Sequence, residues 1–244
     1  MSSSSSNGNA GSSTNRDRDD TSTTSVKLQA FIFDMDGTLL DSEVVWVDAY
    51  EEMLRRRGLP ATHELALQTV YGKAFTDVYA DTKRRHPDFP ITVEQMNDEL
   101  RAIFWELARN RDLGIPGSVN LLKQLATTYP VCVVSGSSSV DVGEGMQLIG
   151  VAPLLKFHLG AEDYAAGKPN PAGFLAAAER LNVAPEACLV FEDSAAGVQA
   201  AKRAGMRCVA LARPGRPGQN VSEADLILED LAGFSLEPFE NRPD

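Results

Sequence analysis

The feature that most constrains the fold is a series of short apolar runs spaced along the chain. Four are clear and a fifth is weaker: LQAFIF (28–33), VCVVS (131–135), ACLVFE (187–192), RCVAL (207–211) and ADLILE (224–229). Because these runs do not alternate with polar residues, they are typical of strands in a parallel sheet that is covered on both faces.

Helical patterns lie between the later runs, at residues 116–129, 170–182 and 194–205. The last of them ends in Gly205, and a glycine at that place is typical of a helix C-terminus. Alternation of strands and helices predicts an α/β fold. We expect a doubly wound, mainly parallel, Rossmann-like sheet.

One stretch interrupts this alternation, because residues 43–113 contain no convincing strand. They carry four helical patterns instead, at 43–58, 63–72, 74–86 and 93–110. A crossover between two strands does not need that much chain. We therefore predict an α-helical cap domain over 43–113, inserted into a catalytic core made of 27–42 and 114–244.

The N-terminal segment differs in composition from the rest of the chain. Its first 25 residues, rich in serine, contain almost no apolar side chain, so they cannot form a packed core. They also lack the apolar stretch of a signal peptide, and their aspartates disfavour a transit peptide. We predict a disordered Ser-rich tail over 1–26 and a cytoplasmic protein.

The charge balance excludes some partners. Asp and Glu total 34 against 23 Lys and Arg, a formal net charge of -11, which argues against a nucleic-acid surface. No apolar stretch approaches the roughly 18 residues of a membrane span. We expect no nucleic acid, no membrane and a monomer, because the fold supplies its own lid.

Cysteines and histidines show no metal-ligand spacing. The three cysteines, Cys132, Cys188 and Cys208, lie in apolar runs far apart in sequence, so we expect buried, reduced thiols. The three histidines are scattered, and we assign them no role.

Polar residues gather where the predicted strands end. In an open α/β sheet, ligands bind at the carboxyl ends of the strands. Around those ends the chain offers four acids, one lysine, one hydroxyl and a glycine: Asp34, Asp36, Ser135, Gly136, Lys168, Glu192 and Asp193.

This set of side chains suits phosphoryl transfer, in which catalysis is mostly positioning and charge neutralisation. A carboxylate can attack the phosphorus and form an aspartyl-phosphate, and Asp34 stands at the strand end. Asp36 can protonate the leaving alkoxide and then deprotonate the attacking water. Because an anion attacks an anion, a cation is needed, and Mg²⁺ prefers carboxylate and phosphate oxygens. Lys168 supplies a second positive charge.

The same residues resemble the motifs of the haloacid dehalogenase superfamily. DMDGTLLDSE is similar to its first motif, VVSGSSS to the second, GKPNP to the third and VFEDSAAGVQAAKRAGM to the fourth. The resemblance covers about residues 28–212, in the right order. It is greatest to sugar-phosphate phosphatases and β-phosphoglucomutases that carry a helical cap after the first motif.

The resemblance implies roles for individual residues. Asp34 would be the nucleophile and Asp36 the acid/base. Mg²⁺ would be held by Asp34, by the backbone carbonyl of Asp36 and by an acid of the fourth motif, which is Asp193 or its neighbour Glu192. The phosphate binders of the family match Ser135 and Lys168, and the Gly136 N–H can also donate to phosphate.

Departures from the mutases favour a phosphatase. Mutases carry a histidine where this chain has Trp46, and an arginine shortly after the cap-loop glycine, where this chain has Gly72 and Lys73. We therefore expect a Mg²⁺-dependent phosphatase that hydrolyses a small phosphorylated metabolite, a sugar or polyol phosphate. The alternatives are a β-phosphoglucomutase-type mutase and a non-catalytic interaction protein on the same fold.

Three further pairs of residues have competing interpretations. Gly72 and Lys73 either contact the substrate from the cap or are a helix-ending glycine and a solvated lysine. Asp41 and Ser42 are interpreted as N-caps of the helix that follows. The pair Phe104 and Trp105 is interpreted as packing within the cap, the alternative being a platform for the substrate.

Overall fold

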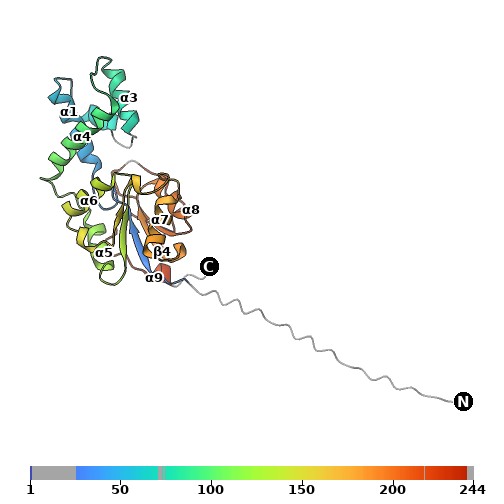
Figure 1. Cartoon of the computed structure of the whole chain (residues 1–244). Helices are drawn as coiled ribbons and strands as arrows, with labels where there is room; N and C mark the ends of the chain where they lie inside the picture. The colour runs from blue at the N-terminus through green and yellow to red at the C-terminus, as the bar shows by residue number, and fades with distance from the viewer. Residues whose placement is uncertain (2–25, 71–72, 74, 217, 241–244) are drawn as a thin grey trace.

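The computed structural model describes residues 1, 26–70, 73, 75–216 and 218–240 (Figure 1). The predicted disordered tail falls almost entirely on residues outside this part of the chain, as does Gly72.

A parallel sheet forms the centre of the core. Its strands are β1 (Ala30–Phe33), β2 (Val131–Val134), β3 (His158–Leu159), β4 (Cys188–Glu192), β5 (Arg207–Leu211) and β6 (Leu226–Leu228). Their order is β3-β2-β1-β4-β5-β6, and every neighbouring pair is parallel. The predicted α/β class with a parallel sheet is confirmed, whereas β3 was not predicted.

The strand order places a switch point at β1. The chain leaves β1 for β2 on one side, and after β3 it returns to β4 on the other side. Phe31 of β1 is level with Val131 of β2 and with Leu189 of β4. Ligands bind in the crevice outside the strand ends at such a point. The segments that follow β1, β2 and β4 therefore meet at one edge of the sheet.

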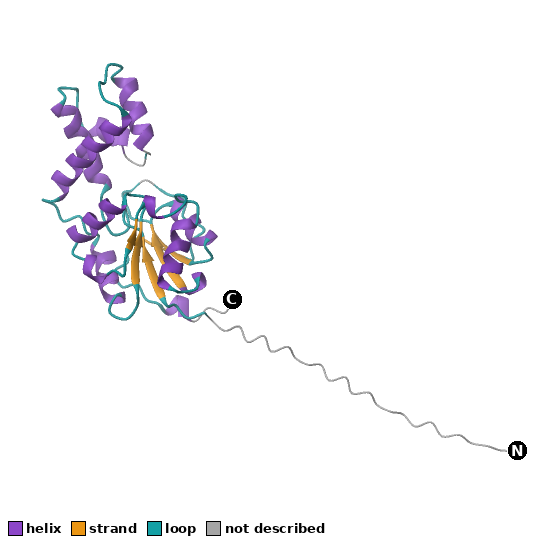
Figure 2. Ribbon diagram, viewed as in Figure 1, coloured by secondary structure: helices purple, strands orange, loops and turns teal. Residues whose placement is uncertain are grey.

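Helices cover both faces of the sheet, as Figure 2 shows. Successive strand residues point to opposite faces, so Phe31 and Phe33 join one buried cluster and Ala30 and Ile32 the other. The first cluster includes side chains of α5 and α6, and the second includes side chains of α7 and α8. The core helices are α5 (Pro116–Leu125), α6 (Ser139–Leu148), α7 (Ala172–Leu181), α8 (Ala195–Arg203) and α9 (Glu237–Glu240). Single 3₁₀ turns span Ala152–Leu154, Ala161–Asp163 and Pro185–Ala187.

In the part of the chain that the structure describes, four helices lie between β1 and α5, and we call them the helical group. They are α1 (Glu43–Arg56), α2 (His63–Val70), α3 (Phe75–Arg85) and α4 (Val93–Ala108). Figure 1 shows them set apart from the sheet. Trp46 of α1 stacks on Phe104 of α4, with ring centroids 4.2 Å apart. These helices match the predicted helical patterns, and the division of the chain into core and cap domains stays a prediction.

Two chain segments join the helical group to the core, and they lie side by side. The Asp41 N–H donates to the Leu113 carbonyl at 2.8 Å, and the Ile115 N–H donates to the Leu39 carbonyl at 2.9 Å. Leu40 and Gly114 form an isolated antiparallel bridge between these two bonds. The position of the entry segment is therefore tied to that of the exit segment.

The described residues include all three cysteines. The three cysteines are buried and free, as expected. In the described part of the chain, none of the helices has both the length and the apolar character that a membrane crossing requires.

Candidate active site

Lys168 joins the ends of three strands. Its ammonium Nζ donates to Asp34 Oδ1 and to Glu192 Oε1, both at 2.5 Å, and to the carbonyl oxygen of Val134 at 3.3 Å. Asp34 follows β1, Val134 ends β2 and Glu192 ends β4. One cation therefore sits at the switch point of the sheet, between two buried carboxylates.

The charges in this cluster do not balance. Burial raises the pKa of Asp34 to about 7. The attraction of Lys168 opposes this rise, whereas the repulsion of Glu192 and Asp36 adds to it. Burial lowers the pKa of Lys168, but the carboxylates of Asp34 and Glu192 more than offset this, so the net shift is upward and the amine stays charged. The cluster thus holds more negative charge than its lysine neutralises.

Asp193 adds a third carboxylate to the cluster. Burial, with the charges of Asp34 and Glu192, raises the pKa of Asp193 to about 9. Thr38 Oγ1 donates to Asp193 Oδ1 at 3.3 Å. The backbone of Gly37 approaches so closely that a Cβ at that position would lie 2.1 Å from Asp193 Oδ2, and its φ is +83°. Only glycine fits both the space and the backbone conformation.

The cluster meets the requirements of a divalent metal site. Asp34, Glu192 and Asp193 each offer a carboxylate oxygen, and these atoms lie within 4.8 Å of one another. Carboxylate oxygens are the ligands that Mg²⁺ prefers, and burial together with the neighbouring carboxylates raises the pKa values of Asp34 and Asp193, which a bound cation would offset. The residues present therefore fit Mg²⁺.

Glu192 differs from the other two acids, because both of its oxygens already accept hydrogen bonds. Oε1 accepts from Lys168, and Oε2 accepts from the Asp193 N–H at 2.9 Å, the Ser194 N–H at 2.8 Å and the Ser194 hydroxyl at 2.9 Å. Its exposed fraction is 1%. A Cβ at Gly197 would lie 1.7 Å from Oε1. This packing favours a role in orienting Lys168 over a role as metal ligand.

Three hydroxyls hold the carboxylate of Asp36. Ser42 donates to Oδ1 at 2.7 Å, whereas Ser137 and Ser135 donate to Oδ2 at 2.8 and 3.3 Å. Sequence reasoning missed Ser42 and Ser137 as partners of Asp36. The hydroxyl-rich run SGSSS after β2 was the available signal for Ser137.

The expected capping role of Asp41 and Ser42 was wrong for their side chains. Ser42 occupies the N-cap position of α1 without a side-chain capping bond. Its hydroxyl is used by Asp36 instead. The Asp41 carboxylate accepts hydrogen bonds from Arg213 and Arg216, which follow β5.

The other predicted phosphate binders lie on the loop after β2. Ser135 is buried, its hydroxyl accepts from the Ser137 N–H at 3.0 Å, and its carbonyl accepts from the Tyr164 hydroxyl at 2.7 Å. Gly136 is exposed. The loop thus presents an accessible backbone position next to a fixed hydroxyl.

Lys73 lies between α2 and α3 of the helical group, where it lines a hollow of about 270 Å³. Its Nζ donates to Asp81 Oδ2 at 2.6 Å. The hollow is lined by Glu43, Trp46, Val70, Lys73, Phe75, Val78, Asn97 and Leu100. Glu43 also lines a second cleft, of about 180 Å³, together with Gly37 and Asp193. The two hollows therefore share a wall at the start of α1.

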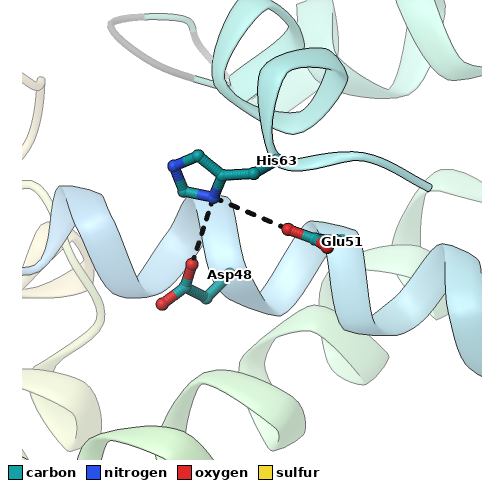
Figure 3. A group of neighbouring side chains, drawn as sticks. All are labelled: Asp48, Glu51 and His63. Atoms are coloured by element: carbon teal, nitrogen blue, oxygen red, sulfur yellow. Dashed lines mark ion pairs between the residues drawn. The ribbon is translucent and has the colours of Figure 1, made fainter.

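A second group of titratable side chains lies in the helical group, as Figure 3 shows. His63 Nδ1 of α2 is 3.6 Å from Asp48 Oδ1 and 3.5 Å from Glu51 Oε2, both on α1. Asp48 also accepts from Arg111 at 2.6 Å. The histidine spacing in the sequence did not predict this cluster, since the turn between α1 and α2 creates it. These contacts, which are ion pairs only when His63 is protonated, link α1 to α2.

Comparison with known proteins agrees with this geometry. A model of the haloacid dehalogenase-like hydrolase family matches residues 28–205. Validoxylamine A 7′-phosphate phosphatase of Streptomyces hygroscopicus subsp. limoneus is 33% identical over 205 residues, 82% of this chain and 92% of that protein. Hexitol phosphatase A of Escherichia coli (strain K12) is 29% identical over 217 residues, 86% of this chain and 95% of that protein.

Solved structures share the fold. The structure described as a putative β-phosphoglucomutase from Thermotoga maritima has a TM-score of 0.72 at 23% identity and covers 84% of this chain and 95% of its own. The family predicted from the four motifs and the predicted enzyme class, a hydrolase, are both confirmed. The chain belongs to the haloacid dehalogenase-like hydrolase family.

Proposed function

We propose that this protein is a Mg²⁺-dependent phosphatase that hydrolyses a small phosphorylated sugar or polyol. The observation that carries the proposal is the Lys168 ammonium between Asp34 and Glu192, next to Asp193 at the switch point of the sheet. A carboxylate beside a fixed cation, with further acids to hold a metal, suits phosphoryl transfer. The two relatives described above, which are named as phosphatases, support the same reaction.

In the first step, a carboxylate oxygen of Asp34 attacks the phosphorus, and the bond from phosphorus to the leaving oxygen breaks. The leaving oxygen takes a proton from Asp36, so an alcohol departs and an aspartyl-phosphate remains on Asp34. Lys168 offsets negative charge on the phosphoryl oxygens. Mg²⁺ held by Asp34, Asp193 and the Asp36 carbonyl would supply further positive charge where the two anions meet.

In the second step, water attacks the phosphorus of the aspartyl-phosphate and gives a proton to Asp36. The acyl-phosphate bond breaks, inorganic phosphate leaves and Asp34 is restored. Both steps need the Asp36 carboxylate at a defined place near the leaving oxygen. The hydroxyls of Ser42 and Ser137, at 2.7 and 2.8 Å, would hold it there.

The remaining roles follow from position. The Ser135 hydroxyl and the Gly136 N–H would donate to phosphate oxygens. Glu192 would keep Lys168 directed toward Asp34, which favours Asp193 over Glu192 as the fourth-motif ligand. The helical group would be the cap, with Lys73, and Gly72 before it, contacting the polar end of the substrate.

Two observations favour hydrolysis over a mutase reaction. Trp46 occupies the place where the mutases carry a histidine, and its ring is stacked on Phe104. An indole cannot shuttle protons at neutral pH. Lys73 is a point charge without the bidentate fork of an arginine, and it is paired with Asp81. At these two positions, Trp46 and Lys73 therefore do not supply the groups that a phosphosugar mutase would use.

A phosphate-release assay tests the proposal. The protein is incubated with a panel of sugar, polyol and nucleotide monophosphates, with Mg²⁺ or with excess chelator. We expect Mg²⁺-dependent release from a sugar or polyol phosphate. Absence of release from the whole panel would support the non-catalytic alternative. Formation of glucose 6-phosphate from β-glucose 1-phosphate and a trace of bisphosphate, faster than phosphate release, would support the mutase.

A further inference from the structure

Asp41 lies in the segment that leads from the core into the helical group, and its carboxylate binds two arginines. Arg216 Nη2 donates to both carboxylate oxygens of Asp41, and Arg213 Nη2 donates to Asp41 Oδ2 at 3.2 Å. The side chains of all three are half-buried, with exposed fractions of 23 to 29%. The arginines follow β5, more than 170 residues away in sequence from Asp41.

The residue after Asp41 reaches the site. The Ser42 hydroxyl donates to Asp36 Oδ1 at 2.7 Å, so only one peptide unit separates the arginine-bound carboxylate from a group that holds Asp36. The exposed fraction of Ser42 is 1%. The Asp41 N–H is tied to the Leu113 carbonyl. A shift of Asp41 would therefore move Ser42, and Ser42 sets one side of the Asp36 carboxylate.

We infer that Arg213 and Arg216, acting through Asp41, are positioning residues that hold Ser42 against Asp36. The inference rests on the proposed function, in which Asp36 donates and accepts the proton. Bidentate pairing of a guanidinium with a carboxylate fixes orientation as well as distance. Both are needed if Asp41 is to hold Ser42 in one place.

The competing possibility is direct contact with the substrate. Arg213 and Arg216 also line the cleft of about 180 Å³ that contains Gly37 and Asp193. Guanidinium groups at that place could bind a second anionic group of the substrate. The two possibilities differ in which kinetic parameter they control, because lost binding raises KM and lost positioning lowers kcat.

The test uses Asp41→Asn and Arg216→Met, each assayed with the best alkyl monophosphate and with p-nitrophenyl phosphate. With the alkyl substrate, we expect each variant to lower kcat by about 10- to 100-fold, since a small misplacement of a catalytic group has effects of this size. We expect KM to change by less than about threefold. A higher KM with kcat preserved would overturn the inference in favour of substrate contact, and unchanged kinetics would overturn it outright.

With p-nitrophenyl phosphate, the leaving group needs no proton, whereas hydrolysis of the aspartyl-phosphate still needs Asp36 as base. Both variants should release a burst of nitrophenolate equal to the enzyme concentration, followed by slow turnover. The burst also shows that the variant is folded and that Asp34 is intact. Loss of the burst together with loss of turnover would contradict a positioning role. Arg216→Lys keeps the charge without the fork, and we expect its kcat to lie between those of wild type and Arg216→Met.

The double variant Asp41→Asn/Arg216→Met separates the two possibilities further. If both residues act through one path, the double variant is no slower than the slower single variant. Additive losses would contradict the inference. Arg56→Met is the matched control, because Arg56 pairs with Glu52 and Glu106 inside the helical group, and its kcat should stay within about twofold of wild type.

Asp36→Asn distinguishes failure of this inference from failure of the proposed function. If Asp36→Asn is inactive while the Asp41 and Arg216 variants behave as wild type, only the positioning inference fails. If Asp36→Asn keeps full kcat, both the positioning inference and the proposed mechanism fail.

Discussion

Asp193 illustrates how burial and chemistry are linked at a single residue. Burial raises its pKa to about 9 from an ordinary value of 3.8, so the folded protein without metal binds a proton there over a wide pH range. An acid whose pKa is raised by folding contributes stability at low pH that is lost as pH rises through its folded pKa. The repulsion between the carboxylates of the site is therefore greatest at alkaline pH and without metal.

We accordingly predict that Asp193→Asn changes the pH dependence of stability. In chelator, the wild-type free energy of unfolding should fall between pH 6 and pH 9, and the fall should be smaller in Asp193→Asn. The reason is that the amide cannot ionise. Urea unfolding at pH 6, 7.5 and 9 measures this. A difference between the two proteins that stays constant over these pH values would contradict the assigned shift.

The second residue-scale prediction concerns the metal. Asp193→Asn should raise the Mg²⁺ concentration for half-maximal activity by about tenfold or more, an effect typical of groups that hold a metal in place. Glu192→Ala should raise it less, because both Glu192 oxygens already accept hydrogen bonds. Mg²⁺ titrations of activity and of Tm measure both. An equal or larger shift in Glu192→Ala would reverse the assignment of the two acids.

Sequence reasoning placed the main charged groups of the site but not the hydroxyls around them. Asp34, Lys168 and Asp193 were expected together because parallel strands bring their carboxyl ends to one edge. The bonds of Ser42 and Ser137 to Asp36 depend on loop geometry that a strand rule does not describe. The pairing of Asp41 with arginines joins segments that no local pattern connects.

At the scale of elements, long apolar patterns were predictable and short or glycine-rich elements were not. β3 has two residues, His158 and Leu159, too few for a pattern. α6 contains Gly143 and Gly145, which weaken a helical signal. Gly145 has a packing reason, since a Cβ there would lie 3.0 Å from the Met35 sulfur. Tertiary packing thus selects a residue that local helix propensity disfavours.

One element-scale prediction concerns Lys73, which lies between α2 and α3, and the hollow that it lines. Lys73→Ala should raise KM for the best substrate more than it lowers kcat, the pattern of lost uniform binding. Lys83→Ala is the control, because Lys83 donates to the backbone carbonyls of Pro87 and Phe89 in the same helical group. Steady-state kinetics of wild type, Lys73→Ala and Lys83→Ala measure both parameters. Equal kinetics for Lys73→Ala and wild type would remove Lys73 from the substrate site.

Another element-scale prediction concerns the contact between α4 and α6. Asp141 Oδ1 of α6 accepts from Arg101 Nε at 2.7 Å and from Trp105 Nε1 at 2.9 Å, both on α4. Asp141→Ala should lower the free energy of unfolding by about 1–3 kcal/mol, because it removes hydrogen bonds to a charged, largely buried group. It should also change Trp105 fluorescence. Glu106→Ala, which breaks an exposed ion pair within the helical group, should cost less than about 1 kcal/mol. Equal losses in both variants would contradict a specific contact.

At the scale of the whole molecule, the candidate site lies at one edge of the sheet, and the helical group is set apart from the sheet (Figure 1). The parallel sheet is common to this chain and to solved structures that it covers almost completely. The sequence predicted this architecture because strand–helix alternation and strand-end motifs repeat along the chain. It could not identify the substrate, since a hollow lined by Glu43, Trp46 and Lys73 depends on how helices pack.

The most direct test of the proposed function compares wild type with Asp34→Asn in Mg²⁺, at saturating concentration of the best sugar or polyol monophosphate. The substitution keeps the size of the side chain and removes the attacking charge. We predict steady phosphate release by wild type and a loss of about 10³-fold or more in Asp34→Asn, with the same circular dichroism spectrum. Phosphate release by Asp34→Asn at a rate comparable to wild type would contradict the covalent mechanism at Asp34.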